Sequence, residues 1–476
     1  MFLRYLYNQK LAHASYLVGC QVTGEAIVVD PGRDIDPYLT EVEAQGLRVT
    51  AVTETHIHAD FLSGARELAD RTGARLYLSD EGDQDWKYRY LDRYDHVLLK
   101  DGSCFKIGNI QFDVIHTPGH TPEHISFLVT DTAGADKPIG LFSGDFVFVG
   151  DVGRPDLLEK AAGISGASET GARQMFASLR RFRQLPDYLQ VWPAHGAGSA
   201  CGKALGAIPS STVGYEKMFN VALSFTDEDV FVKALIEGQP EPPRYFAMMK
   251  RLNKEGPPVL GKLPAPEHLP FKQLKTLLAG GTTVVDTRSA AAFATGHVPG
   301  SINIPHDGSF PNWAGWLLDY TTPFYLIADW QRIEDVMRDL IYIGLDNAAG
   351  YWETSILDTW REHGQPLESY QVRRPAQIAD EIIKGEVNVL DVRYADEWQA
   401  GHLPNASHIM LGDLRQRLAE VPSGKPIVVQ CRSGARSAIG ASILQAGGIE
   451  AVINLTGGYL DWTAAGLPVE RNGPVN

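Results

Sequence analysis

The chain has 476 residues, too many for one hydrophobic core, and this length predicts about three domains. Its 44% hydrophobic and 21% charged residues are ordinary for a globular protein, and the formal net charge of −15 argues against nucleic acid or an anionic membrane as the main partner. No apolar run is long enough to span a bilayer, and the first residues do not read as a secretory signal. The scattered Cys20, Cys104, Cys201 and Cys431 indicate free thiols in a reducing cytoplasm.

The first part of the chain, up to about residue 200, alternates short β-rich runs with turns and helices. Buried strands are predicted at residues 25–32, 46–55, 124–130, 139–146 and 189–195. In the last four of these runs, a His or an Asp stands at or beside the strand end. A rigid sheet presents ligands to a shared edge in this way, so we expect these side chains to meet.

Pro and Gly become frequent at residues 237–243 and 255–270, which indicates a connector with extended stretches. An internal repeat follows, in which "VVDTRSAAAFATGHVPGSINIP" (284–305) matches "VLDVRYADEWQAGHLPNASHI" (389–409). Each copy alternates strand, helix and strand, which predicts a doubly wound α/β unit around a parallel sheet. The predicted parts of this multi-domain α/β chain are a first domain at 1–240, a Pro-rich linker at 241–268, and the two repeats at 269–366 and 372–476.

Four segments at strand ends carry candidate metal ligands. The first, "THIHADF" (55–61), holds His56, His58 and Asp60 in alternation. The others are "HTPGHT" (116–121), "SGD" (143–145) and "PAH" (193–195). A single His-x-His is a weak signal, but four His and Asp segments in this order predict a metal site.

These segments resemble those of the metallo-β-lactamase superfamily over roughly residues 1 to 235. The resemblance implies an αββα sandwich with its metals at one sheet edge. Two-metal members such as glyoxalase II would have a His where this chain has Phe61. Because Phe has no lone pair, the second position loses a ligand and a neighbouring cation becomes costly to hold. We therefore predict one metal, since a second one would rest on Asp60 and His195 alone.

Two histidines and one carboxylate around one metal are the pattern of non-haem Fe(II) oxygenases. Within the superfamily, the chain looks most like the persulfide dioxygenases, on its "THIHAD", "PGHT", "GD" and "GR" segments. This resemblance implies one Fe(II) per chain, held by His56, His120 and Asp145, with zinc as the alternative metal. Phe61 departs from this family too, but the His that it replaces is not an iron ligand there, so its loss should be tolerated.

The same resemblance implies roles for the side chains around the metal. His58, Asp60 and His195 would orient the ligands, water or substrate. His116 and His124, which flank the ligand His120, are interpreted as orienting or structural imidazoles.

Two further residues keep two interpretations each. Arg154, in "GDVGRPD", would either anchor the substrate or support the loop that bears Asp145. Cys201 follows His195 by six residues. It is either a thiol that passes sulfur to the metal site or a buried structural cysteine.

"VVQCRSGARSA" (428–438) predicts a buried strand, a tight loop and the start of a helix. Cys431 is the first residue after the strand, and Gly434 permits an unusual backbone angle in the loop. Successive backbone N–H groups and the helix dipole would stabilise an anion there, and Arg432 and Arg436 add positive charge. A thiolate in such a loop is a ready nucleophile toward sulfane sulfur.

This loop resembles the active-site loop of rhodaneses, Cys-x-x-Gly-x-Arg-Ser, and the "DVR", "GHLPNA" and "GGYLDWTAAGLP" segments extend the resemblance over roughly residues 370 to 476. The role implied for Cys431 is to carry a persulfide sulfur and donate it to an acceptor. The alternative is a Cys-based phosphatase loop, which has a similar anion cradle. The first repeat places Ala328 or Asp329 at the position of Cys431, so we predict that this copy is inactive and serves as a scaffold or docking domain.

Together the resemblances imply a detoxifying enzyme for sulfide or persulfide. One domain would oxidise the sulfane sulfur of a persulfide of glutathione, coenzyme A or bacillithiol with O₂ to sulfite. Cys431 would then transfer persulfide sulfur to sulfite, giving thiosulfate, and the fusion raises the effective concentration of the shared sulfite. The alternatives are a zinc-dependent thioester hydrolase of the glyoxalase II kind with a sulfurtransferase domain, and a non-catalytic sulfur-relay or sensing protein. We also expect a cytoplasmic homo-oligomer without nucleic-acid or membrane partners.

Overall fold

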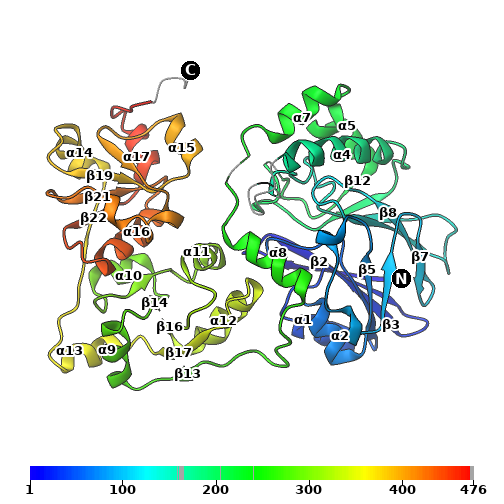
Figure 1. The fold of residues 1–476 in the computed structure, drawn as a ribbon, viewed down its shortest axis with the longest axis horizontal. Coiled ribbons are helices and arrows are strands. Elements are labelled where there is room, and N and C mark those ends of the chain that lie inside the picture. Colours follow the sequence, from blue (N-terminus) through cyan, green and yellow to red (C-terminus); the bar gives the residue numbers. More distant parts are fainter. Residues whose placement is uncertain (158, 160–165, 204, 240, 472–476) are drawn as a thin grey trace. The chain divides into compact units, whose positions relative to one another are not determined.

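The computed structural model describes residues 1–157, 159, 166–203, 205–239 and 241–471, which form two compact units (Figure 1). Unit 1 is Met1–Leu263 with Leu340–Gly344, and unit 2 is Pro264–Asp339 with Leu345–Asn476. Residues 158, 160–165, 204 and 240 of the predicted first domain, and 472–476 of the last one, lie outside the described residues. Within the described ranges, no helix combines the length and apolar composition needed to cross a bilayer.

The first sheet of unit 1 has six strands in the order β1-β2-β3-β4-β5-β6. They are β1 (Phe2–Asn8), β2 (His13–Cys20), β3 (Glu25–Val29), β4 (Arg48–Thr53), β5 (Arg75–Ser79) and β6 (His96–Leu99). Strands β1 to β3 are antiparallel, and β3 to β6 are parallel. Because β3 and β4 are parallel neighbours, the residues that follow them, Asp30 and the 54–61 segment, begin at the same edge.

The second sheet of unit 1 has the order β12-β11-β10-β9-β8-β7. Its strands are β7 (Cys104–Ile107), β8 (Ile110–His116), β9 (Ile125–Asp131), β10 (Gly140–Gly144), β11 (Gln190–Pro193) and β12 (Ser211–Thr212). Neighbours are antiparallel except β10 and β11, which are parallel. Asp145 and His195, which follow β10 and β11 in the sequence, therefore lie at the same edge of the sheet.

The two sheets pack face to face and carry helices on their outer faces (Figure 1). Ile27 of the first sheet and Phe112 of the second belong to the apolar core between them. Helices α1 (Asp36–Ala44) and α2 (Ala65–Thr72) cover the first sheet, and α4 (Ala167–Phe182) and α7 (Glu228–Ile236) cover the second. This layering confirms the predicted αββα sandwich. The shorter helices are η1 (Gln84–Trp86), η2 (Leu91–Arg93), α5 (Val213–Phe219) and α6 (Val221–Ser224).

The predicted linker is not extended throughout, because it contains helix α8 (Tyr245–Glu255). Phe246 and Met249 of this helix are buried in unit 1, so its pattern of apolar side chains is that of a packed helix. The Pro-rich stretches on both sides obscured this pattern in the sequence. As a result, α8 belongs to the structure around the candidate ligands rather than to a spacer.

Unit 2 contains two parallel five-stranded sheets with equivalent strand orders, β13-β17-β16-β14-β15 and β18-β22-β21-β19-β20. The first repeat has β13 (Glu267–His268), β14 (Val284–Asp286), β15 (Ile302–Asn303), β16 (Phe324–Ile327) and β17 (Ala348–Trp352). The second has β18 (Gln371–Arg373), β19 (Asn388–Asp391), β20 (Ala406–His408), β21 (Ile427–Gln430) and β22 (Val452–Leu455). The shared order confirms that the sequence repeat is a structural repeat.

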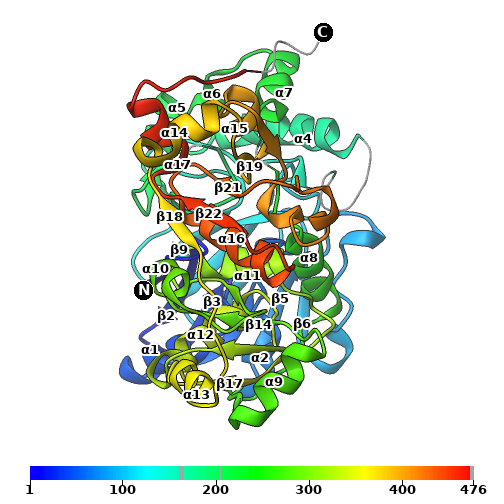
Figure 2. The ribbon, with the colours of Figure 1, turned by 90° about the vertical axis from the view of Figure 1, so that its left-hand side faces the viewer.

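Helices cover both faces of these sheets, as the doubly wound prediction requires. In the second repeat, Ile382 of α14 and Trp462 of α17 pack with Val428 on one face, and Gly440 of α16 lies against Val429 on the other. Helix α16 also packs against β15 and α10 of the first repeat (Figure 2). The helices of unit 2 are α9 (Phe271–Ala279), α10 (Ala290–Thr295), α11 (Phe310–Leu317), η3 (Trp330–Arg332), α12 (Ile333–Tyr342), α13 (Ile356–Glu362), α14 (Pro375–Ile383), α15 (Ala395–Ala400), η4 (Leu411–Asp413), η5 (Leu418–Glu420), α16 (Ala435–Ala446) and α17 (Gly458–Ala464).

The Asp-x-Arg motif of each repeat forms the same ion pair, which is buried in the second repeat and partly buried in the first. Arg393 donates from Nε and Nη2 to the Asp391 carboxylate at 2.7–3.0 Å, and from Nη2 to the Gly401 carbonyl at 2.7 Å. Arg288 makes the same set of bonds with Asp286 and Gly296. These bonds connect a strand end to the loop after the next helix. Because the repeat without a catalytic cysteine keeps the same bonds, we infer that the motif has a structural role.

We expect Arg393→Ala to lower the free energy of unfolding of the second repeat by about 3–5 kcal/mol, since it leaves the fully buried Asp391 carboxylate without its cation. The measurement is urea unfolding of the full chain, in which the reactivity of Cys431 toward an alkylating reagent reports the unfolding of the second repeat. Arg417→Ala, which removes an exposed ion pair with Glu420, is the matched control and should leave the midpoint unchanged. Equal midpoints for the two variants would contradict the structural role.

Candidate functional site

The candidate ligands of the first segment lie in the irregular stretch after β4, and two buried carboxylates hold its backbone. Asp30 accepts hydrogen bonds from the backbone N and the hydroxyl of Thr55, at 2.7 and 3.0 Å. Glu123 Oε1 accepts from the backbone N of Ile57 at 2.8 Å. Backbone groups without a strand or helix partner are satisfied in this way, so the stretch holds one conformation.

Asn253 of α8 holds the second half of the same stretch. Its Nδ2 donates to the carbonyls of His58 and Phe61, both at 2.8 Å, and its Oδ1 accepts from the backbone N of Ser63 at 2.9 Å. Asn253 is 1% exposed. The sequence analysis missed this residue because it lies in the segment predicted to be a linker.

The structure brings His56, His120 and Asp145 together, and we call these residues the first trio. Their ligand atoms lie within 4.8 Å of one another, and Asp145 Oδ2 is 3.9 Å from His56 Nε2 and 3.3 Å from His120 Nε2. His56 Nε2 and both Asp145 oxygens are buried without a hydrogen-bond partner among the described residues. Such atoms are costly to bury unless a cation contacts them, so two imidazoles and one carboxylate fit a zinc or ferrous ion.

Hydrogen bonds on the far side of each imidazole direct Nε2 of the first trio inward. His120 Nδ1 donates to the Arg154 carbonyl at 3.0 Å, and His56 Nδ1 lies 3.0 Å from the Thr55 hydroxyl. Burial lowers the pKa of His56 and of His120, which favours the neutral imidazole that a metal requires. Burial alone would raise the pKa of Asp145, but the neighbouring His195 and His120 hold it below its usual value.

His58 is paired with a carboxylate instead. Its Nε2 lies 3.1 Å from Asp30 Oδ1. Burial by itself lowers the pKa of His58, but the charge of Asp30 and this hydrogen bond raise it to about 9. Asp30 is a partner that the sequence analysis did not identify, although the run "EAIVVDPG" also ends a strand with an Asp.

A second trio, Asp60, His195 and Cys201, lies beside the first. Its ligand atoms are also within 4.8 Å of one another, and His195 Nε2 is 3.3 Å from both Asp60 Oδ2 and Asp145 Oδ1. Burial raises the pKa of the Cys201 thiol, and the charges of Asp60 and Asp145 add to this effect. Phe61 is completely buried and packs against His13 and His58, with ring centroids 3.8 and 4.4 Å apart.

Arg154 connects the segments that surround the candidate metal site. Its side chain is completely buried, donates to Asp156 at 2.8 and 2.6 Å, and donates from Nη1 to the Ala200 carbonyl at 3.1 Å. Its backbone carbonyl accepts from His120, and its backbone N donates to the Cys201 carbonyl at 3.3 Å. Of the two predicted roles, these contacts favour support of the loops over contact with a substrate.

The Cys431 loop directs the backbone N of Gly434 at the thiol, 3.1 Å from Sγ, and this donor can stabilise a thiolate. The Ser437 hydroxyl lies 3.5 Å from Sγ, but it donates its proton to Asn454 Oδ1 at 2.6 Å. Gly434 has φ +103°, and a Cβ there would lie 2.9 Å from Thr456 Cα, so only glycine fits. Arg436 donates to both oxygens of Glu397 at 2.6 and 2.7 Å.

Arg432 is exposed on the same loop, next to the thiol in sequence. Arg436 is held in its ion pair, so Arg432 is the loop arginine better placed to meet an anionic acceptor from solvent.

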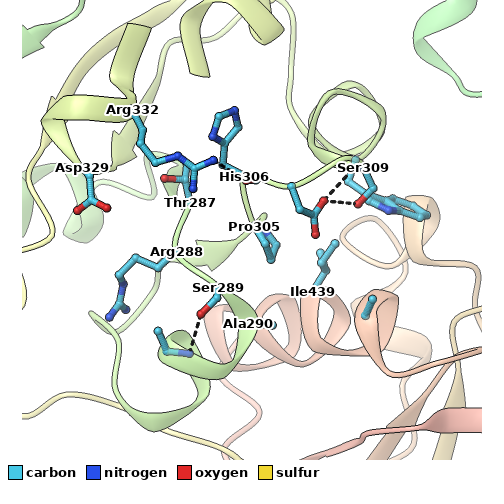
Figure 3. A pocket seen from close by; sticks show the side chains of 14 residues that line it. Thr287, Arg288, Ser289, Ala290, Pro305, His306, Ser309, Asp329, Arg332 and Ile439 are labelled. Atoms are coloured by element: carbon cyan, nitrogen blue, oxygen red, sulfur yellow. Dashed lines mark hydrogen bonds between the residues drawn. The ribbon is translucent and has the colours of Figure 1, made fainter. Parts of the chain in front are cut away.

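Strand register settles which residue of the first repeat replaces Cys431. Asp286 pairs with Ile327, and Asp391 pairs with Gln430, so Ala328 is the counterpart of Cys431. Asp329, the residue after Ala328, lines a cavity of about 430 Å³ (Figure 3). Polar residues on its wall include Thr287, Arg288, His306, Asp329 and Arg332, but no cysteine lines it. Ala435 and Ile439 of the second repeat complete the lining, so the pocket lies between the two repeats at this edge.

We expect Arg154→Ala to weaken metal binding at the first trio by about 10- to 100-fold, because the carbonyl that orients His120 loses its support. Competition with a chelator for the bound metal measures this change. Arg180→Ala, on the exposed side of α4, is the control and should not alter the affinity. An unchanged affinity combined with a raised KM would instead assign Arg154 to the substrate.

Residues 9–195 match the Metallo-beta-lactamase superfamily, and residues 271–333 and 374–465 match the Rhodanese-like domain. Among curated relatives, the chain is 29% identical over 297 residues to a Beta-lactamase hydrolase-like protein of Xylella fastidiosa strain 9a5c, covering 56% of this chain and 63% of the relative. It is 33% identical over 180 residues to a Hydroxyacylglutathione hydrolase of Rhodospirillum rubrum, covering 38% and 60%. The chain thus spans less than two thirds of these relatives.

Among solved structures, a metallo-beta-lactamase from Staphylococcus aureus subsp. aureus COL matches with a TM-score of 0.67 and 44% identity. The match covers 74% of this chain and 98% of that one. Together with the αββα sandwich and the buried His and Asp cluster at its sheet edge, this shows that the chain belongs to the metallo-β-lactamase superfamily and carries rhodanese-like domains after its metal-binding domain.

Proposed function

We propose that the chain is a persulfide dioxygenase with thiosulfate sulfurtransferase activity, acting in sulfide or persulfide detoxification in a reducing cytoplasm. A low-molecular-weight thiol persulfide, O₂ and water would give the free thiol, sulfite and two protons. The persulfide of glutathione, coenzyme A or bacillithiol is the proposed substrate class. The free state of all four cysteines is consistent with a reducing compartment.

The first trio is the observation that carries this proposal. Two imidazoles and one carboxylate leave coordination positions for a substrate, as in Fe(II) oxygenases. Bound there, Fe(II) would supply the redox chemistry that O₂ requires. The protein orients His120 through the Arg154 carbonyl and buries all three ligands to within 2% exposure, which keeps bulk water from the reacting sulfur.

The Cys431 loop supports the second half of the proposal. In the transfer step, sulfite attacks the outer sulfur of a persulfide carried on Cys431. The S–S bond breaks, its electron pair stays on Sγ, and thiosulfate leaves. Gly434 N lies 3.1 Å from Sγ and would stabilise the thiolate that this step releases.

Metal-dependent thioester hydrolysis is the second candidate function. The similarity to the hydrolase of Rhodospirillum rubrum supports it, because that relative is named for the hydrolysis of a hydroxyacylglutathione. Phe61 counts against it, because a two-metal hydrolase needs a ligand where Phe61 offers none. The two candidates differ in O₂ consumption.

The full chain, purified without oxygen and loaded with Fe(II), should consume O₂ when a low-molecular-weight persulfide is added and should release sulfite. His120→Ala should reduce this rate by at least about 100-fold, because it removes one of three ligands. An oxygen electrode and sulfite quantification provide the readouts, and His96→Ala, an exposed histidine of β6 outside both trios, is the control. Thioester cleavage without oxygen uptake would support the hydrolase instead.

Cys431→Ser should abolish thiosulfate formation and leave oxygen uptake largely intact, because the two reactions use separate sites. Thiosulfate and O₂ are measured in the same reaction mixture. Cys104→Ser, which changes an exposed cysteine outside both sites, should leave both reactions unchanged. Loss of oxygen uptake in Cys431→Ser would refute the proposed division of labour between the domains.

A further inference from the structure

The cavity between the two repeats lies where an open parallel sheet binds its ligands. In the first repeat, β14 has β15 on one side and β16 on the other, so the chain crosses from one side of β14 to the other. Ligands of doubly wound proteins bind at the carboxyl ends of the strands at such a point. Thr287, His306 and Asp329 come shortly after the ends of β14, β15 and β16, and all three line the cavity.

The charge at this strand end differs between the two repeats. Because Ala328 is the counterpart of Cys431, Asp329 is the counterpart of Arg432. The 3₁₀ helix η3 follows Asp329 directly, whereas the second repeat has the tight turn at Gly434 that directs a backbone N–H at the thiol. The anion-binding loop is thus replaced by one that bears a carboxylate, which repels a ligand that is only an anion.

Arg332, the last residue of η3, supplies a positive charge to the same cavity. Its Nη2 donates to the His306 carbonyl at 3.2 Å, and it forms no ion pair with any described residue. The other arginine of the wall, Arg288, is already paired with Asp286, with Nη2 and Oδ2 2.7 Å apart. Arg332 is therefore the cation of this wall that is available to a carboxylate of a ligand.

Two carboxylates also line the cavity, and their protein partners differ. Asp307 Oδ1 accepts from the backbone N and the hydroxyl of Ser309, both at 2.8 Å. Asp329 Oδ1 accepts from the Thr354 hydroxyl at 2.7 Å, and its Oδ2 has no hydrogen-bond partner in the described part of the chain. Figure 3 shows the Asp329 carboxylate apart from the Arg332 guanidinium. The wall thus carries one available negative and one available positive charge that do not neutralise each other.

Apolar atoms complete the wall on the side of the second repeat. Ala435 and Ile439 of α16 contribute to it, together with Trp313 of α11. Ala435 directly follows Gly434, whose backbone N is 3.1 Å from Cys431 Sγ. A ligand in the cavity would therefore contact the first turn of the helix that begins at the Cys431 loop.

We propose that this cavity binds a small molecule that carries both a carboxylate and an ammonium group, as an amino acid or a short peptide thiol does. Arg332 binds the carboxylate, Asp329 binds the ammonium group, and the apolar wall packs against the rest of the molecule. Of the three proposed thiol carriers, glutathione and bacillithiol have both groups, and coenzyme A has neither. This choice of carrier rests on the proposed function, whereas the binding of such a molecule does not. The inactive repeat then serves to hold the carrier.

The test is a calorimetric titration of the full chain, without O₂ or persulfide, with S-methylglutathione as the probe. This probe keeps the carboxylates and the ammonium group, but it lacks the thiol that could react at Cys431 or bind the metal. One equivalent should bind. Arg332→Ala and Asp329→Asn should each raise its dissociation constant at least about tenfold, because each removes one charge-assisted contact. Arg417→Ala, an arginine of unit 2 outside the cavity, is the matched control and should leave the constant unchanged.

The same probe with its amino group acetylated separates the two charges. It should bind the unchanged chain at least about tenfold more weakly, with no further loss in Asp329→Asn. Both substituted side chains are exposed, so the variants should keep the urea midpoint of the unchanged chain. Absence of binding, equal constants in both variants and the unchanged chain, or a loss confined to Arg332→Ala would overturn the proposal. None of these results depends on oxygen uptake, so the dioxygenase proposal is tested separately.

Discussion

Buried acceptor atoms without protein donors are the constraint on which the first unit depends. The Asp145 carboxylate lies between His120 on one side and His195 on the other, with both oxygens lacking a hydrogen bond among the described residues. In such surroundings a charge is tolerated only where an opposite charge lies nearby. The side chains at this sheet edge therefore have the composition of a cation-binding site. A cation bound there would also offset the cost of burying these acceptor atoms.

This constraint explains why the irregular segments of unit 1 are held so firmly. The stretch after β4 has no strand or helix to satisfy its backbone, and Asp30, Glu123 and Asn253 provide the missing partners. Arg154 links the segment that orients His120 to the segment that carries Cys201. Each ligand is therefore placed by contacts from another part of the chain, which gives metal ligands the fixed geometry they need.

The two repeats of unit 2 share the features that maintain the fold and differ in the residues of the candidate catalytic loop. Both keep the strand order and the Asp–Arg ion pair, so these features serve the fold. They differ in the loop after the central strand, where Cys431 and Gly434 occupy one copy and Ala328 begins the loop of the other. A change confined to one loop can remove a nucleophile because the surrounding sheet does not depend on it.

Periodicity and motif order were enough to predict the doubly wound repeats and the four segments that carry candidate ligands, since strand patterns and short ligand motifs are local properties of the chain. The sandwich and the choice of His56, His120 and Asp145 as ligands followed from the resemblance to a known family. The partners Asp30 and Asn253 and the register that selects Ala328 were not predictable, and the sequence left open whether Cys201 reaches the metal pocket. Each depends on contacts between segments far apart in sequence, up to 195 residues for Asn253 and His58. Such proximity arises only when the sheets pack, because packing and not local propensity sets the distances between distant side chains.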